Sequence, residues 1–88
     1  MDTDNLNKYV FTTKFVLKDN SPILKVYHDS EGDWQFLGKE TNLTEDDAMV
    51  VSLDEILKFD PSLQQLLTLP IDSMAYRVDQ KSIWIFDK

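Results

Sequence analysis

The sequence predicts an α+β fold, with a mainly antiparallel sheet of about five to six strands and two short adjoining helices packed on one face. Segments rich in β-branched and aromatic residues occupy the first and last parts of the chain, as strands do. Two helix-start signals follow one another between them. The connections are short, which favours antiparallel neighbours over the long crossovers of a parallel sheet.

The chain is expected to begin with a tail and a long strand. After Met1, residues 2–7 contain only one sizeable apolar side chain, Leu6, and residues 1–7 are predicted to form a flexible tail. Residues 8–17 are rich in aromatic and β-branched residues and are predicted to form one strand with a bend or bulge. A loop that contains Pro22 ends it, and residues 23–28 resume as a strand.

A hairpin is expected next. Residues 29–33 are typical of a turn, with Gly32 able to adopt a positive φ, and residues 34–38 form the returning strand. Alternation along that strand places Trp34 and Phe36 on the same face. One apolar face per strand fits an antiparallel sheet that is covered on one side.

The middle of the chain is predicted to contain a long loop and a short strand. Residues 39–47 are polar and acidic, and this loop is longer than the usual length of about four to six residues. Residues 48–51 are apolar and are predicted to form a short buried strand.

Two short helices are expected after that strand. Ser52 and Glu55 have the spacing of a capping box, in which the hydroxyl bonds to the amide of the third helical residue and its carboxylate reaches back. Asp60 as the N-cap and Pro61 at the first helical position open a second helix, which extends to Leu67.

The chain is expected to end in a hairpin. Its strands are residues 74–79 and 82–87, joined by a turn at residues 80–81. Apolar side chains occupy both faces of the last strand, which predicts that it is largely buried and central in the sheet.

Size and composition predict one domain over residues 8–88. The 42% hydrophobic content is enough for a packed core. The absence of cysteine excludes disulfides, thiolate nucleophiles and thiolate zinc sites. The polar N-terminus lacks the features of a secretory signal, and no apolar run is long enough to span a membrane. We therefore expect a cytoplasmic protein without a membrane role.

Acidic residues are concentrated in the middle of the chain. The net charge is −7, and residues 29–60 contain ten acidic and two basic residues, a balance of −8, while the rest of the chain has a balance of +1. Nucleic-acid binding needs Lys and Arg to neutralise phosphates, so nucleic acid is an unfavourable partner. Acidic loops also simply keep small proteins in solution. The more specific interpretation is a basic partner.

Residues that carry chemistry are few. His28 is the only histidine, so histidine-rich metal sites are excluded and a Ser-His-Asp site could use only this imidazole. Its expected role is structural, and the alternatives are a pair with Asp29 or a pH-sensitive group. Asp29, Glu31 and Asp33 alternate as in a calcium loop but lack the further ligands at EF-hand spacing. We therefore predict no catalytic residue, no metal site and no cofactor.

The remaining motifs point to packing. Gly32 and Gly38 are the only glycines, which excludes a glycine-rich phosphate-binding loop. Trp34 and Trp84, with Tyr27 and Tyr76, could line a ligand groove or form an interface hot spot, although aromatic residues more often pack in a core. Arg77, the only arginine, is expected to pair with an acidic residue of the middle segment.

Several segments resemble a known family; they are residues 32–40, 50–57, 60–63, 66–67 and 69–73. The order of their hydrophobic and turn residues is similar to that of a bacterial family of unknown function, grouped with predicted immunity proteins of polymorphic toxin systems. The likeness covers residues 23–86, and the stretch after Glu40 departs in length and composition. The resemblance implies a cytoplasmic interaction protein that neutralises a toxin, and it supplies no catalytic residues.

Together these observations predict a non-enzymatic protein-binding domain, immunity-like and directed at a basic toxin. The alternative is a small-ligand-binding sensor or accessory domain with an aromatic pocket beside the sheet. The contact surface is expected to comprise exposed acidic residues and an exposed tryptophan: Asp33, Trp34, Glu40, Glu45, Asp46 and Asp47.

Overall fold

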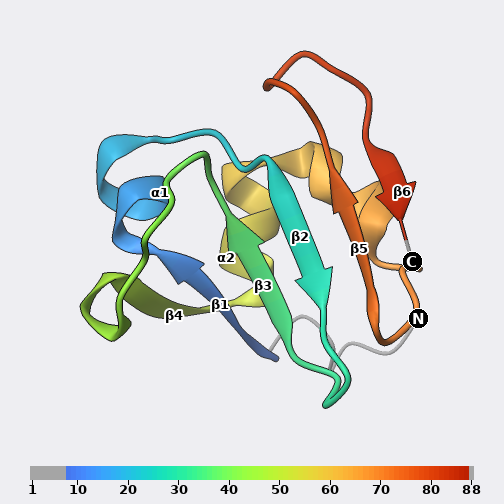
Figure 1. Cartoon of the computed structure of the whole chain (residues 1–88), viewed down its shortest axis with the longest axis horizontal. Helices are drawn as coiled ribbons and strands as arrows, with labels where there is room; N and C mark the ends of the chain where they lie inside the picture. The colour runs from blue at the N-terminus through green and yellow to red at the C-terminus, as the bar shows by residue number, and fades with distance from the viewer. Residues whose placement is uncertain (1–7, 88) are drawn as a thin grey trace.

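The computed structural model describes residues 8–87, so the tail expected at residues 1–7 lies outside the described residues. In chain order the elements are β1 (Tyr9–Thr13), α1 (Lys14–Asp19), β2 (Lys25–His28), β3 (Trp34–Leu37), the 3₁₀ helix η2 (Glu45–Asp47), β4 (Ala48–Ser52), α2 (Leu53–Phe59), the 3₁₀ helix η3 (Pro61–Leu66), β5 (Ser73–Tyr76) and β6 (Ile85–Asp87). They form an α+β fold with one mixed, mostly antiparallel sheet, which confirms the predicted fold class (Figure 1).

The sheet has six strands in the order β4-β1-β3-β2-β5-β6. Neighbouring strands are antiparallel except β1 and β3, which are parallel with Phe11 opposite Gln35. The buried Thr12 hydroxyl donates a 2.7 Å hydrogen bond to the Phe36 carbonyl and adds a link across this parallel pair. The hairpin β2–β3 therefore inserts between β1 and β5.

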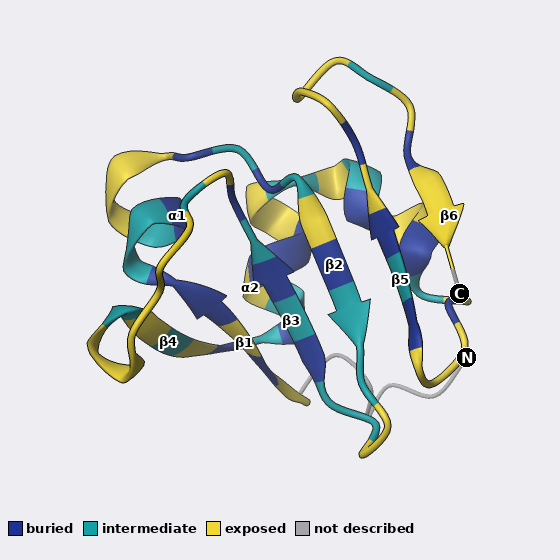
Figure 2. Cartoon of the chain, in the orientation of Figure 1, coloured by how far each residue is buried: buried dark blue, intermediate teal, exposed yellow. Residues whose placement is uncertain are grey.

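The helical layer lies on one face of the sheet, as expected. In Figure 1, α2 and η3 lie behind strands β2, β3 and β5, and Figure 2 shows the buried positions concentrated between the two layers. The core combines inward side chains of the strands with those of the helices: Val10, Val26, Phe36, Val51, Ala75, Leu53, Ile56, Leu57, Leu63 and Leu66. Among residues 8–87, no helix has both the length and the apolar character needed to cross a membrane.

The N-terminal segment differs from the sequence prediction. Residues 8–17 were expected to form one bent strand, but the chain leaves β1 at Thr13 and enters α1. The Thr13 hydroxyl accepts a hydrogen bond from the Val16 amide at 3.3 Å and so caps the helix. Asn20 ends α1 in the left-handed conformation with φ of 56°. Local capping therefore overrides the strand propensity of these residues.

The predicted turn and helix starts are confirmed. Gly32 has φ of 86° in the β2–β3 turn, and the Asp29 amide donates to the Asp33 carbonyl at 2.9 Å. The Ser52 hydroxyl accepts a hydrogen bond from the Glu55 amide at 3.1 Å, as the capping box predicts. The Glu55 carboxylate, however, accepts a 3.4 Å hydrogen bond from the Ser52 hydroxyl. The Asp60 carboxylate accepts a 3.0 Å hydrogen bond from the Ser62 amide.

Both edge strands correct the sequence prediction. Residues 48–51 were expected to be buried, but β4 lies at one edge and only Val51 is buried. The strand expected to be central, residues 82–87, supplies β6, which lies at the other edge and is exposed along its length. Its apolar run does not mark burial on both faces, because the helices cover only one face of the sheet. Of the apolar residues in this segment only Trp84 is buried, and Phe86, opposite the buried Ala75, is still 53% exposed at the edge.

Candidate interaction surface

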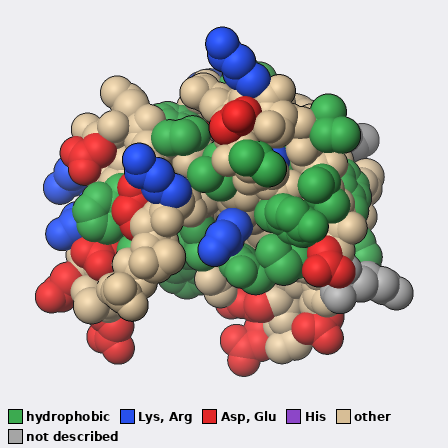
Figure 3. Space-filling model, turned by 45° about the horizontal axis from the view of Figure 1, so that its top comes forward, with side chains coloured by type: hydrophobic (Ala, Val, Ile, Leu, Met, Phe, Trp, Pro, Cys, Tyr) green, Lys and Arg blue, Asp and Glu red, His purple; other side chains and the backbone are tan. Residues whose placement is uncertain are grey.

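The second face of the sheet is left uncovered by α2 and η3. The strand register places one side chain from each strand in a continuous row on this open face: Val50, Phe11, Gln35, Tyr27, Met74 and Asp87. A second row contains Leu37, Lys25, Tyr76 and Ile85. Figure 3 shows hydrophobic side chains gathered on the surface, interrupted by single charged ones. We call these two rows, together with Tyr9 on the same side of β1, the open face.

Several apolar side chains of the open face are exposed. Tyr9 is 70% and Val50 is 56% exposed, and Phe11, Tyr76 and Ile85 are also exposed. Apolar groups that form a continuous patch typically mark a contact surface, and aromatic residues are enriched where proteins bind one another. Residues 8–17 were predicted only to form a bent strand, without a surface role, and the two-residue spacing of Tyr9 and Phe11 is the signal that places both on one face.

Two shallow hollows lie along the open face. The first has a volume of about 320 Å³ and is lined by Tyr27, His28, Asp29, Gln35, Asp72, Ser73, Met74 and Asp87. The second, of about 300 Å³, is lined by Phe11, Thr12, Thr13, Gln35, Leu37, Leu43, Thr44, Asp47 and Ala48. Each is large enough to receive a protruding side chain or a small ligand.

The acidic β2–β3 turn is organised around one carboxylate. The Asp29 side chain accepts hydrogen bonds from the amides of Asp33 at 2.9 Å and Glu31 at 3.0 Å. These bonds, with that from Asp33 the largest contribution, lower the pKa of Asp29 below its ordinary value of 3.8. Asp29 therefore stabilises the turn, while Glu31 projects into solvent and Asp33 is half-buried.

A second acidic projection precedes β4. The Asp47 carboxylate accepts a 3.0 Å hydrogen bond from the Thr44 amide and lies 3.2 Å from the Lys14 ammonium group. The Thr44 bond is the main reason why the pKa of Asp47 lies below 3.8. Asp47 thus holds the 3₁₀ turn, whereas Glu45 and Asp46 are exposed on it.

Glu40 is folded inward. Its Oε2 accepts a 2.9 Å hydrogen bond from the Ser21 hydroxyl, and its Oε1 is buried without a hydrogen-bond partner among the described residues. Gly38 makes this position possible, because a Cβ atom there would lie 2.7 Å from Oε1. Glu40 is therefore half-buried and offers little of its carboxylate to a partner.

Trp34 was expected to be exposed, and this expectation is wrong. The side chain is only 6% exposed because its place on β3 turns it toward the helical layer. Its ring stacks on His28 at a centroid distance of 3.9 Å, and the His28 Nδ1 lies 2.8 Å from the Leu69 carbonyl oxygen. His28 therefore has a structural role, and its ring joins β2 to the segment before β5 rather than to Asp29.

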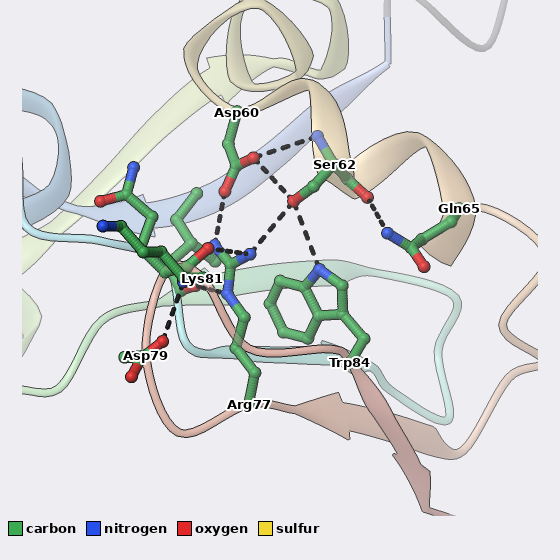
Figure 4. Close-up of polar contacts among 9 residues, drawn as sticks. Asp60, Ser62, Gln65, Arg77, Asp79, Lys81 and Trp84 are labelled. Atoms are coloured by element: carbon green, nitrogen blue, oxygen red, sulfur yellow. Dashed lines mark hydrogen bonds and ion pairs between the residues drawn. The ribbon is translucent and has the colours of Figure 1, made fainter.

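Arg77 is the centre of a buried polar cluster shown in Figure 4. Its guanidinium group donates to the Asp60 carboxylate at 2.6 Å, the Ile23 carbonyl at 2.9 Å and the Ser62 hydroxyl at 3.2 Å. The Arg77 Cζ atom lies 4.2 Å from the centroid of the Trp84 ring. The Trp84 indole N–H also donates a 3.3 Å hydrogen bond to the Ser62 hydroxyl. The expected pairing of Arg77 with an acidic residue of the middle segment is confirmed.

Most acids of the middle segment remain without an ion-pair partner. Among the described residues, ion pairs join Asp47 to Lys14, Asp54 to Lys58 and Asp60 to Arg77. The acids outside these pairs are Asp29, Glu31, Asp33, Glu40, Glu45, Asp46 and Glu55. Figure 3 shows acidic side chains gathered mainly along the lower and left margins of the view. Of these acids, Glu31, Glu45, Asp46 and Glu55 are exposed to solvent.

Of the six expected contact residues, the structure places three together and separates the others. Glu45, Asp46 and Asp47 form η2 before β4, and Glu45 and Asp46 are the two of the six residues that are exposed. Within residues 8–87, no group of three His, Asp or Glu side chains is arranged to hold a metal ion.

Comparison of the chain with protein-family models, curated proteins and solved structures gave no match. The functional argument therefore depends on the surface itself. That surface consists of an exposed apolar sheet face and two acidic projections, which are the β2–β3 turn and the η2 turn. Such a combination suits recognition of a macromolecule, since apolar contact contributes affinity and charge sets the association rate and the choice of partner.

Proposed function

We propose that the protein is a non-enzymatic binding domain for a basic protein partner in the cytoplasm. The observation that carries this proposal is the open face, whose exposed Tyr9, Phe11, Val50 and Tyr76 lie on the sheet. Two acidic projections border it, and their exposed carboxylates form no ion pair among the described residues: Glu31, Glu45 and Asp46. Burying such side chains in a partner contributes roughly 25 cal/mol per Å² of apolar area removed from water. The acids attract basic partners before contact and disfavour acidic ones.

The resemblance to predicted immunity proteins supports one specific form of this proposal. In that form the basic partner is a toxin, and the protein neutralises it by covering its functional surface. A polyanion-binding toxin must carry exposed Lys and Arg residues, which are the chemical complement of Glu31, Glu45 and Asp46.

A capture experiment with matched charge variants tests the proposal. The immobilised protein is exposed to a lysate of the organism that makes it, and bound proteins are released with increasing salt and identified. The variant E45K/D46K reverses the exposed acids next to β4, while D19K/D79K reverses two exposed acids that lie outside the middle segment and off the open face. Each reversal adds two charges, so both variants have a net charge of −3 instead of −7.

The proposal predicts a basic protein that is retained by the wild type and D19K/D79K but released at lower salt from E45K/D46K. A partner that binds all three equally, or an empty wild-type bait, contradicts it. For the immunity form, the captured protein expressed alone should arrest growth, and co-expression of this chain should restore it.

The first hollow supports a second candidate function, that of a small-ligand sensor. It places Tyr27 and Met74 beside the carboxylates of Asp29, Asp72 and Asp87, a lining suited to a small organic cation. His28 also lines this hollow and stacks on Trp34, so binding should change tryptophan fluorescence. A saturable change with small cationic metabolites, together with an empty protein bait, favours the sensor.

A further inference from the structure

The outer side of β4 is an unpaired sheet edge. Within residues 8–87, β4 pairs with β1 alone and is the terminal strand of the sheet. An edge of this kind presents backbone N–H and C=O groups that can pair with another extended chain.

The register identifies which backbone groups point outward. The Leu53 amide donates to the Lys8 carbonyl at 2.7 Å, so these two residues form a hydrogen-bonded pair of the antiparallel ladder. Hydrogen-bonded and non-hydrogen-bonded pairs alternate, so Val51 and Met49 also direct their N–H and C=O groups toward β1. The residues between them, Ala48, Val50 and Ser52, direct theirs away from the sheet.

Two of these outward groups are used within the chain. The Ala48 amide donates to the Glu45 carbonyl, and the Ser52 carbonyl lies at the N-cap of α2, where the first helical hydrogen bond is accepted. Among the described residues, both Val50 groups, the Ala48 carbonyl and the Ser52 amide have no backbone partner and remain for an external strand. They span one short stretch centred on Val50, whose side chain is 56% exposed.

Acidic residues flank this edge at both ends. Exposed Glu45 and Asp46 precede β4, and Asp54 and exposed Glu55 follow it, with Asp54 offset by Lys58 at 3.1 Å. This pattern disfavours a second copy as the occupant. A two-fold antiparallel pairing centred on Val50 would bring the acids before β4 in one copy toward those after β4 in the other, and the like charges would repel.

We propose that β4 receives an extended segment of a basic partner as a seventh strand, with Lys or Arg residues at both ends of the added segment and an apolar residue opposite Val50. This mode of binding rests on the proposed function. Backbone pairing to the outward groups supplies affinity, and the flanking acids select basic ends. The apolar residue beside Val50 extends the hydrophobic row that continues through Phe11 on the open face.

A designed peptide tests this mode without knowledge of the natural partner. The probe is a peptide of about nine residues, with two basic residues at each end and alternating valine and threonine between them. A second peptide with glutamate in place of the basic residues is the control. Peptide binding to the labelled full chain is followed by amide chemical shifts and by hydrogen exchange.

The hydrogen-exchange pattern is the decisive readout. Before addition of the peptide, the Val50 and Ser52 amides should exchange rapidly, while the Met49 and Val51 amides are protected by β1. The basic peptide should slow exchange at Val50 and Ser52 at least tenfold, and the glutamate peptide should not. High salt should weaken binding because the flanking charges are exposed.

Variants of the chain separate the backbone contribution from the charge contribution. V50P removes the outward N–H at an edge position where proline is tolerated, whereas V50A keeps it. We expect V50P to weaken peptide binding about tenfold or more relative to V50A. E45K/D46K should weaken it as well, and D19K/D79K should have a smaller effect.

Each alternative outcome overturns the edge proposal. Binding that shifts the amides of Tyr27 and Tyr76 without protecting Val50 places the peptide on the open face, and the basic-partner function then stands without the edge mode. Protection of Val50 in the free protein together with a dimeric mass makes a second copy the occupant. Absence of binding to the wild type removes the edge mode, while the capture experiment independently decides the proposed function.

Discussion

The Arg77 Nη2 atom lies 2.6 Å from the Asp60 Oδ2 atom, and this ion pair joins the start of η3 to the segment that follows β5. The Arg77 side chain is 2% exposed and that of Asp60 is 15% exposed. A cation at this depth is stable only where opposite charge and hydrogen-bond acceptors surround it. The pair thus fixes the hairpin of β5 and β6 against the helical layer.

The first prediction concerns this pair. Asp60→Asn keeps an oxygen atom for the amide of Ser62 but leaves the Arg77 charge uncompensated, so we expect a loss of about 3 kcal/mol in unfolding free energy. Asp54→Asn, which breaks the exposed pair with Lys58, is the matched control and should cost less than about 0.5 kcal/mol. Urea unfolding measures both. Equal losses would show that Asp60 is not the main compensating charge.

The second prediction is the dependence of stability on pH. The carboxyls of Asp29, Asp47 and Asp79 have pKa values lowered below 3.8, and the main cause in each is a hydrogen bond, from the Asp33 amide, the Thr44 amide and the Ser82 hydroxyl. A lowered pKa in the folded state contributes stability above the unfolded value, and that contribution is lost as pH falls through the folded value.

Unfolding free energy should therefore decrease as the pH falls below about 4, where unfolded aspartates begin to bind protons. Asp29→Asn keeps an oxygen acceptor for the turn amides while removing its titration, so this variant should lose less stability between pH 5 and pH 2 than the wild type. Asp46→Asn, at an exposed position of η2, is the control. If Asp29→Asn loses as much stability between pH 5 and pH 2 as the wild type, Asp29 does not contribute to the loss of stability in acid.

The third prediction distinguishes the two glycines. In Gly38→Ala the new Cβ would lie 2.7 Å from the Glu40 Oε1 and 2.9 Å from the Ser21 Oγ, so we expect a loss of about 1–3 kcal/mol. Gly32→Ala meets no atom within 4 Å but has φ of 86°, and its cost of about 1 kcal/mol comes from the backbone.

The two costs should respond differently to second substitutions. Glu40→Ala should relieve part of the loss in Gly38→Ala and none of the loss in Gly32→Ala, and Asn at position 32 should be better tolerated than Ala. Thermal unfolding of the single and double variants measures the coupling. Additive effects of Gly38→Ala and Glu40→Ala would contradict the close contact.

Much of the fold could be predicted because its signals are local. Gly32 in the turn, Ser52 as the N-cap and the pair of Asp60 and Pro61 each specify a backbone conformation within a few residues. The start of α1 was missed because the Thr13 cap lies in a segment with strong strand propensity, where two local signals conflict.

The surface was harder to predict because exposure depends on neighbours distant in the sequence. Trp34 and Tyr9 are both strand aromatics, but only the side of the sheet on which each lies makes one buried and the other exposed. The strand order also depends on contacts between residues distant in the sequence. The apolar run through Ile85 does not reveal that β6 is an edge, and the inward position of Glu40 depends on Ser21, nineteen residues away.

The last prediction tests whether Lys25 keeps the open face from self-association. Lys25 lies between Leu37 and Tyr76 in the second row of that face, and its side chain is exposed. Lys25→Leu would join these neighbours into a continuous apolar row that extends to Ile85. We expect the variant to form dimers or larger species as its concentration rises, as measured by sedimentation. Lys81→Leu, at an exposed turn, makes the same chemical change away from the sheet and should leave the mass unchanged. Equal behaviour of the two variants would show that the open face is not held apart by this single charge.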